Sequence, residues 1–183
     1  MLSPLPPTPV TVLRTSRLAL REICADDSEF MCALLNDAAF LRHIGDRGVR
    51  SLDDAQRYIS DGPVASYAKH GFGLWLVERT ADHAKLGICG LVKREGLADP
   101  DIGYAFLPAY RAAGYAQEAA SATLRHARDV LGVTRVVAIV SPENIESTRL
   151  LDRLGLRLES RVRLADDAAE LDLFAWDARA SAP

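Results

Sequence analysis

The period of the hydrophobic pattern changes several times along the chain, and each period predicts a different element. Residues 17–21 alternate polar and apolar side chains, which predicts a strand with one buried face. Six further apolar-rich runs lie between charged residues, glycines and prolines, and this pattern also predicts strands. They cover residues 72–78, 85–93, 101–106, 135–140, roughly 156–162 and 169–176. The pattern therefore predicts about seven strands.

Helical spacing of apolar residues predicts two helices between the first and second strands. Asp26 or Asp27 can cap the first of them, which is expected to end near Asn36. Ser51 and Asp54 form a capping box that starts the second helix. The segment between the two helices contains two glycines and is predicted to be a loop.

The longest predicted helix covers residues 114–131, which are rich in alanine and contain no proline. Gly132 is expected to stop it, and a shorter helix over residues 142–154 is expected to end at Gly155. The order is then strand, two helices, three strands, helix, strand, helix and two strands. This order predicts an α/β (mixed α+β) domain with a central, mostly antiparallel mixed sheet and helices on both faces.

Composition narrows the classes of protein that fit this pattern. The 183 residues, about half apolar and a quarter charged, suit one domain over residues 11–177, with a flexible proline-rich leader (1–10) and a tail (178–183). A formal net charge of -3 gives no broad positive field, so neither a nucleic acid nor an anionic membrane is expected as a partner. The three cysteines show no C-x-x-C spacing, so neither disulfides nor a metal site is expected. Since no secretory signal or long apolar run is present, we expect a cytoplasmic protein.

Residues 108–116 form a turn of small residues between a predicted strand and the longest helix. The first N–H groups of a helix have no partner within it and lie where its dipole is positive, so they can hold an anion such as a pyrophosphate. Gly114 lets the backbone approach a ligand closely, and Ala112, Ala113 and Ala116 keep the turn open. By spacing alone, an ordinary connection between strand and helix fits equally well. The sequence lacks the glycine motifs of P-loop and dinucleotide-binding proteins.

Four blocks of the sequence together resemble one known family. Arg111-x-x-Gly114-x-Ala116 is similar to the Q/R-x-x-G-x-G/A signature of the GNAT acetyltransferases. The other blocks occur in the family's order: residues 14–18 followed by Leu20-Arg21, residues 101–104, and Asn144-x-x-Ser147 followed by Leu154-Gly155. Together they are similar to the branch that includes the ribosomal-protein alanine N-acetyltransferases, the RimJ/RimL-like proteins. The resemblance spans roughly residues 11–177 and implies the GNAT fold, with two splayed central strands.

The resemblance also implies roles for individual residues. Backbone amides of the turn would bind the pyrophosphate of the co-substrate acetyl-CoA, and Arg111 would add positive charge beside it. The turn residues concerned are Ala112, Ala113, Gly114, Tyr115 and Ala116. The pantetheine would pair with the strand that ends at Phe106 and Leu107, and a main-chain N–H near one of these two residues would stabilise the oxyanion. No metal is implied.

Asn144 and Ser147 lie three residues apart, so they share one face of a predicted helix. The resemblance implies that Asn144 contacts the pantetheine and that Ser147 hydrogen-bonds the departing sulfur. The alternative is that Asn144 only caps the helix and Ser147 is an ordinary polar residue of its first turn.

Asp101 matches an acidic position that often serves as the general base in this family. A carboxylate with an ordinary pKa of about 3.9 is a weak base. The role therefore requires burial that raises the pKa, or a water chain that relays the proton. The alternative is an ordinary turn residue that follows Asp99-Pro100.

The resemblance implies an N-acetyltransferase that moves acetyl from acetyl-CoA directly to a primary amine. The acceptor is expected to be a protein N-terminal α-amine or a small-molecule amine, and the protein a monomer or a homodimer. An α-amine has a pKa of about 8 and is partly neutral in the cell, so it demands less of a base than a lysine side chain does. The alternative function is a non-catalytic module that binds or senses acyl-CoA.

Overall fold

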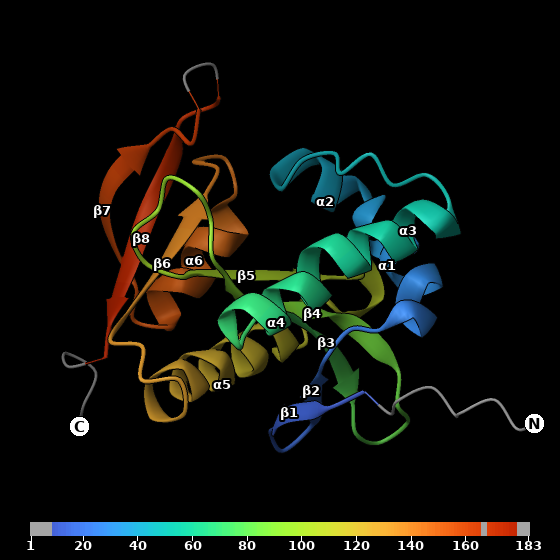
Figure 1. Cartoon of the computed structure of the whole chain (residues 1–183). Helices are drawn as coiled ribbons and strands as arrows, with labels where there is room; N and C mark the ends of the chain where they lie inside the picture. The colour runs from blue at the N-terminus through green and yellow to red at the C-terminus, as the bar shows by residue number, and fades with distance from the viewer. Residues whose placement is uncertain (1–8, 166–167, 179–183) are drawn as a thin grey trace, which may run out of the picture.

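Eight strands form one sheet in the computed structural model, which describes residues 9–165 and 168–178 (Figure 1). The strands are β1 Thr11–Arg14, β2 Leu18–Arg21, β3 Leu74–Arg79, β4 Lys85–Val92, β5 Asp101–Phe106, β6 Arg135–Val140, β7 Arg157–Val162 and β8 Leu171–Asp177. Their order across the sheet is β1-β2-β3-β4-β5-β6-β8-β7. The expected leader up to residue 8 and the expected tail from residue 179 lie outside the described residues.

Neighbouring strands pair antiparallel except for β5 and β6, which are parallel. The predicted mixed, mostly antiparallel sheet is therefore confirmed. The prediction of about seven strands was wrong by one, because β1 was missed. β1 has four residues, none of them buried, and it follows a proline-rich stretch, so its hydrophobic pattern is weak.

Within the described residues, six α-helices flank the sheet together with three short helical turns. The helices are α1 Ser28–Leu35, α2 Ala38–His43, α3 Leu52–Ile59, α4 Ala65–His70, α5 Tyr115–Asp129 and α6 Ile145–Arg153. The turns are Ala25–Asp27 and Pro108–Tyr110, both 3-10, and the π-type turn Ser60–Val64. No helix in the described ranges is long and apolar enough to cross a membrane.

Two helices before the second predicted strand were expected, and the structure has four. α2 lies in the segment predicted to be a loop, and its six residues are too few to show a helical period. It is held instead by its cap, since Asp37 accepts hydrogen bonds from the N–H groups of Ala39 (3.1 Å) and Phe40 (3.2 Å). α4 continues α3 through the π-type turn, and Pro63 within that turn hides the continuation from the sequence pattern.

Of the two helix caps predicted before the second predicted strand, the structure confirms the cap of α3 but not that of α1. The capping box of α3 is confirmed: Ser51 Oγ accepts from the Asp54 N–H (3.1 Å), and Asp54 Oδ2 accepts from the Ser51 N–H (2.9 Å). The expected cap of α1 was wrong in its chemistry. Asp27 precedes α1, but its carboxylate accepts from the N–H of Cys24 (3.0 Å) and from Arg21 rather than from the helix.

All four residues of β2 are buried, so the prediction of a strand with one exposed face was also wrong. Arg21 can be buried because its guanidinium donates to both carboxylate oxygens of Asp27 (2.8 Å each) and to Glu78 Oε2 (3.0 Å). Lys85 also contacts Asp27 (2.6 Å). Burial by itself raises the pKa of Asp27, but hydrogen bonds from Arg21, from the Cys24 N–H and from Lys85 outweigh it and hold the pKa well below its ordinary value.

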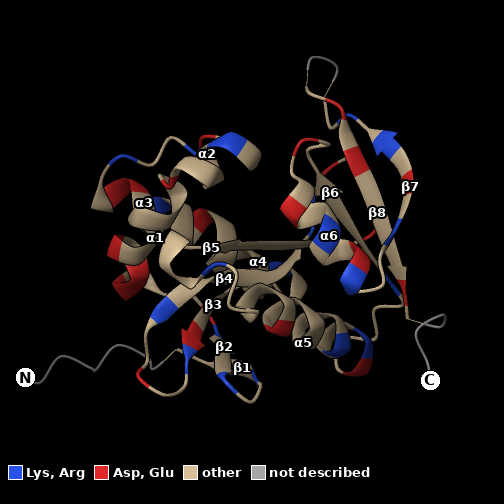
Figure 2. Ribbon diagram, turned by 180° about the vertical axis from the view of Figure 1, so that it is seen from behind, with Lys and Arg blue, Asp and Glu red and all other residues tan. Residues whose placement is uncertain are grey.

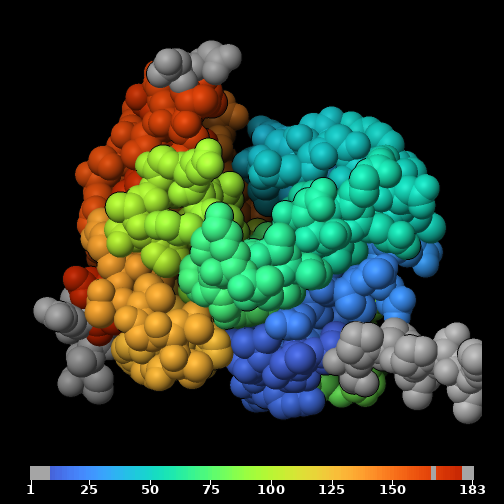
Figure 3. Space-filling view, viewed as in Figure 1, coloured from blue at the N-terminus to red at the C-terminus, as the bar shows by residue number. Residues whose placement is uncertain are grey.

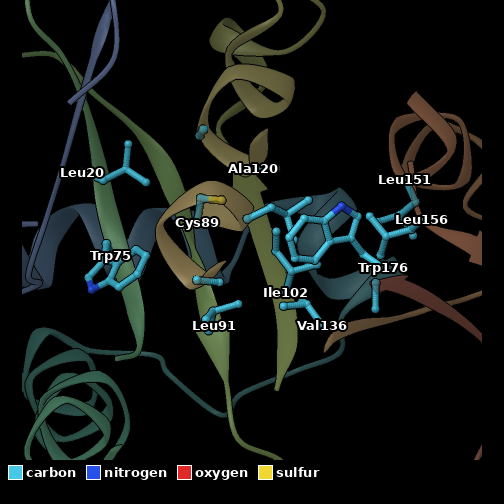
Figure 4. Packing of buried hydrophobic residues seen from close by; sticks show 14 of the residues in the cluster. Leu20, Trp75, Cys89, Leu91, Ile102, Ala120, Val136, Leu151, Leu156 and Trp176 are labelled. Atoms are coloured by element: carbon cyan, nitrogen blue, oxygen red, sulfur yellow. The ribbon is translucent and has the colours of Figure 1, made fainter. Parts of the chain in front are cut away.

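The apolar core lies on both faces of the sheet. α5 and α6 cover one face, and α1, α2 and α3 cover the other. α5 faces the sheet mainly with alanines, which let the helix pack close to the strands. Figure 4 shows Ala120 of α5 near Cys89 of β4, with Trp75 on one side and Trp176 on the other. This packing fixes the start of α5 relative to the end of β5.

We expect Asp27→Asn to destabilise the fold by about 3 kcal/mol, because it leaves the buried guanidinium of Arg21 without its anion. Chemical denaturation of the two proteins measures the difference. Since the pKa of Asp27 is lower in the folded than in the unfolded protein, its contribution is present above pH of about 4 and is lost as the pH falls through the folded pKa.

Asp46→Asn is the matched control, because it removes a carboxylate from an exposed pair with Arg50. This control should change the stability little. Equal effects of the two substitutions would contradict the role assigned to the buried pair.

Candidate active site

β5 and β6 separate almost as soon as they meet, which opens a gap within the sheet. Their register is confined to Asp101 opposite Val137, and the N–H of Val137 donates to the carbonyl of Pro100 (2.9 Å). Beyond that point β6 pairs with β8 along its whole length. Figure 2 shows β5 running between the β1–β4 part of the sheet and the part that contains β6, β8 and β7. The splay implied by the family resemblance is therefore present.

The backbone of β5 directs polar groups into this gap. In an antiparallel ladder, the N–H and C=O of one residue point to the same side, and successive residues alternate sides. The N–H of Leu107 donates to Leu86 at the β4 side (3.0 Å), so Phe106 and Tyr104 direct their backbone groups toward the gap. Arg111 Nε donates to the carbonyl of Phe106 (2.9 Å). Of the two candidate oxyanion donors, the Leu107 N–H is therefore occupied, and the Phe106 N–H faces the gap.

At the end of β5 the chain forms the predicted turn of small residues before α5. Gly114 stands at the N-cap of α5 with φ 80°, and Ala112 also has a positive φ of 59°. The backbone bond from Glu118 N–H to Gly114 C=O (3.0 Å) closes the first turn of the helix, so the N–H groups of Tyr115 and Ala116 come before the first intrahelical donor. Residues 111–114 are exposed. The turn thus presents backbone donors to solvent, as an anion site requires.

Arg111 lies beside the turn, but its charge is already matched. Its guanidinium forms an ion pair with Asp37, the residue that caps α2, and its Nε holds the Phe106 carbonyl. Burial tends to raise the pKa of Asp37, and the hydrogen bonds from Arg111 and from backbone N–H groups overcome this and lower it. Arg111 therefore connects the end of β5 to α2.

Tyr115 is held from both sides by arginines. The guanidinium of Arg17 lies 4.5 Å from the centre of its ring, and Arg79 donates to its hydroxyl (3.4 Å). These two contacts hold the Tyr115 side chain in place beside the turn.

Asn144 and Ser147 lie at the start of α6, as predicted. Asn144 is the N-cap, and its Oδ1 accepts from the N–H of Ser147 (3.1 Å), so the capping interpretation of Asn144 holds. The cap uses only the side-chain oxygen. Ser147 Oγ lies 2.7 Å from the hydroxyl of Tyr104, which crosses from β5 to α6. The first turn of α6 is thereby fixed against β5.

Tyr104 is a site residue that the sequence pattern did not predict. Burial raises the pKa of its hydroxyl to about 12, against an opposing effect of the hydrogen bond with Ser147. At neutral pH it is therefore a neutral hydroxyl that can donate and accept. Its place in the block of residues 101–104 was the only sequence signal for it, since its partner lies 43 residues further along the chain.

Asp101 begins β5 at the point where the two strands separate, and it is only 1% exposed. It is therefore not an ordinary turn residue. Its Oδ2 pairs with Arg94 (2.5 Å), and its Oδ1 accepts from the N–H of Ile139 on β6 (3.4 Å). Burial raises the pKa of Asp101, while the positive charge and hydrogen bond of Arg94 act in the opposite direction.

The candidate base and the Tyr104–Ser147 pair lie on opposite faces of β5. Side chains of a strand alternate between its faces, so Asp101 and Gly103 share one face and Tyr104 occupies the other. A Cβ added at Gly103 would lie 3.3 Å from Leu74 and 3.8 Å from Val92.

Both of these neighbours line an open groove of about 420 Å³ between α4 and the ends of β3 and β4. The molecular surface is hollowed there (Figure 3). Two residues that line the groove therefore lie against the face of β5 that carries Asp101, whereas the Tyr104–Ser147 pair lies across the strand.

Comparisons with known proteins identify the class. Residues 17–157 match the family described as acetyltransferase (GNAT) domain. The chain is 29% identical over 155 residues to the uncharacterized N-acetyltransferase YoaA of Bacillus subtilis, covering 83% of this chain and 86% of that protein. A GNAT-family acetyltransferase structure from Bacillus anthracis aligns with a TM-score of 0.76 and 24% identity, covering 91% of this chain and 98% of that one. RimL, a ribosomal L7/L12 alpha-N-protein acetyltransferase solved with coenzyme A, aligns with a TM-score of 0.78 and 16% identity over 92% and 98% of the two chains.

The splayed sheet and the matched domain define an acetyltransferase. The chain belongs to the GNAT family, whose members take the acetyl group from acetyl-CoA. The fold class expected from the sequence is thereby confirmed.

We expect Arg94→Gln to raise the pKa of Asp101 further, because a positive charge that favours the carboxylate is removed while the burial stays. Carbon-detected NMR titration of the aspartate carboxyls measures the shift. Arg128→Gln is the control, since Arg128 pairs with Asp129 at the exposed end of α5. An unchanged or lowered pKa of Asp101 in the Arg94 variant would show that Arg94 does not act on this carboxyl.

Proposed function

We propose that the protein transfers acetyl from acetyl-CoA to a primary amine by direct attack of the amine on the thioester. The observation that carries this proposal is the open edge of β5, which leads from Asp101 to the exposed amides before α5. A thioester on a long polar arm fits this arrangement, because its anionic end and its reacting end need separate sites joined by hydrogen-bonding groups.

Acetyl-CoA, the acetyl donor, is held by backbone groups. The amides of Ala112, Ala113, Gly114, Tyr115 and Ala116 hold the pyrophosphate. The pantetheine amides pair with the groups of β5 that face the gap, in place of a neighbouring strand. The N–H of Phe106 is the donor for the oxyanion of the tetrahedral intermediate, because it faces the gap and the N–H of Leu107 does not. Arg111 supports this edge by holding the Phe106 carbonyl.

Ser147 and Tyr104 act on the sulfur side. A thiol with a pKa of about 8.5 leaves readily as a thiolate, so it needs a hydrogen bond more than a full proton. Ser147 provides that hydrogen bond, and Tyr104 orients its hydroxyl (2.7 Å). The Oδ1 atom of Asn144 accepts the capping hydrogen bond from Ser147, so its side-chain NH2 group is the one that can hydrogen-bond the pantetheine.

Asp101 acts on the amine side as general base through a water molecule. The raised pKa of this buried carboxyl supports the role, since a stronger base takes a proton more readily. The amine enters through the groove beside Gly103, on the same face of β5 as Asp101. The proton that leaves the amine passes to the carboxylate, and the electron pair of the broken C–S bond leaves with the sulfur.

The acceptor class we favour is a protein N-terminal α-amine. Its lower pKa suits a single buried carboxylate whose basicity is limited by Arg94. The likeness to RimL, whose acceptor is the α-amine of a ribosomal protein, supports this choice. A small-molecule amine is the second candidate, because the groove is open and wide enough for one.

The assay is thiol release from acetyl-CoA with a panel of peptides and small amines. We expect turnover with peptides that have free N-termini and none with the same peptides blocked at the N-terminus. Asp101→Asn should lower kcat by about a hundredfold or more and abolish the fall in rate toward low pH, because the base is lost. Asp99→Asn, two residues away in a half-buried pair with Arg135, is the control. Coenzyme binding without turnover on any amine would instead favour an acyl-CoA sensor.

Ser147→Ala is expected to lower kcat about tenfold with little change in KM for acetyl-CoA, since the lost hydrogen bond acts on the departing sulfur. Tyr104→Phe should lower it less. The double variant should be no slower than Ser147→Ala, because Tyr104 acts through Ser147. Strictly additive losses in steady-state kinetics would refute this dependence.

A further inference from the structure

The turn between β1 and β2 is fixed to the first turn of α5 through one carboxylate. Glu118 accepts hydrogen bonds from Thr15 Oγ1 (2.5 Å), from Ser16 Oγ (3.3 Å), and from the N–H (3.1 Å) and Nε (2.6 Å) of Arg17. Figures 1 and 2 both show the β1–β2 hairpin beside α5. Residues about a hundred positions apart in the sequence therefore meet at the mouth of the anion site.

Arg17 extends from this turn over the small-residue turn before α5. Its Nη1 donates to the carbonyl of Ala113 (3.1 Å), and its guanidinium lies 4.5 Å from the centre of the Tyr115 ring. Its Nη2 lies 3.4 Å from the position that a Cβ on Gly114 would take. The side chain is 46% exposed. Arg17, rather than Arg111, is thus the arginine that covers the mouth of α5.

We propose that Arg17 is a positioning residue for the coenzyme: it orients the Ala113–Gly114 peptide so that the Gly114 N–H points at the pyrophosphate. In a trans peptide the C=O of one residue and the N–H of the next point in opposite directions. Holding the Ala113 carbonyl on the Arg17 side therefore turns the Gly114 N–H away from it, toward the open side of the turn. This inference rests on the proposed use of acetyl-CoA.

The ion pair with Glu118 adds an electrostatic part. Glu118 lines an open groove of about 310 Å³ that begins at Gly114, so its negative charge lies near the place proposed for phosphate. Arg17 neutralises that charge (2.6 Å). Loss of Arg17 would release the Ala113 carbonyl and leave an unpaired carboxylate beside an anionic ligand, and both effects weaken binding.

The test compares Arg17→Gln with Arg14→Gln, which makes the same change of charge at an exposed residue of the same hairpin. We expect Arg17→Gln to weaken CoA binding about tenfold in calorimetry, as loss of a charge-assisted hydrogen bond does. Pantetheine, which has no phosphate, should bind the two variants equally. In kinetics the KM for acetyl-CoA should rise and kcat should change by less than about twofold.

Two further variants separate positioning from stability. Arg17→Lys keeps the positive charge but lacks the planar guanidinium, so it should weaken CoA binding less than Arg17→Gln does. Adding Glu118→Gln to Arg17→Gln should restore part of the CoA affinity, because the unpaired carboxylate is removed. If the role of Arg17 were purely structural, Arg17→Gln would instead lower the melting temperature and weaken the binding of CoA and of pantetheine equally.

Equal CoA affinity in the Arg17→Gln and Arg14→Gln variants would overturn the inference and leave the proposed function intact. Failure of the unmodified protein to bind CoA would overturn the proposed function, and the inference with it.

Discussion

The unpaired edge of β5 is the constraint on which the rest of the structure depends. A backbone N–H or C=O inside a sheet needs a partner, and β6 provides one only at the level of Asp101. The edge beyond that point can stay open because other contacts hold the strand: β4 pairs with its whole length, Arg111 takes the Phe106 carbonyl, and Tyr104 reaches α6. The site is thus a break in the sheet that side chains stabilise.

The charges around the site are arranged in pairs. Arg94 faces Asp101, Arg111 faces Asp37, and Arg17 faces Glu118. The proposed pyrophosphate site therefore relies on oriented peptide groups rather than on a surplus of cations. This is consistent with a chain whose formal net charge is -3, and it explains why composition alone gave no sign of an anion site.

The sequence predicted the elements whose patterns are local. The bounds of β5 and β6 matched the predicted residues, and α5 and the capping box of α3 were found because spacing, alanine content and cap residues act within a few positions. β1 and α2 were missed because they are short, and α4 was missed because Pro63 hides its continuation from α3. The contacts of Tyr104 with Ser147 and of Arg17 with Glu118 join residues 43 and 101 positions apart, so no local pattern could record them.

The single point of register between β5 and β6 has a mechanical consequence. The two parts of the sheet, β1–β5 and β6–β8, are in register only at that point, so no backbone ladder fixes the distance between them beyond it. Side chains that bridge the two parts determine that distance instead. Single substitutions at the bridging positions can therefore alter the width of the gap while every strand keeps its register.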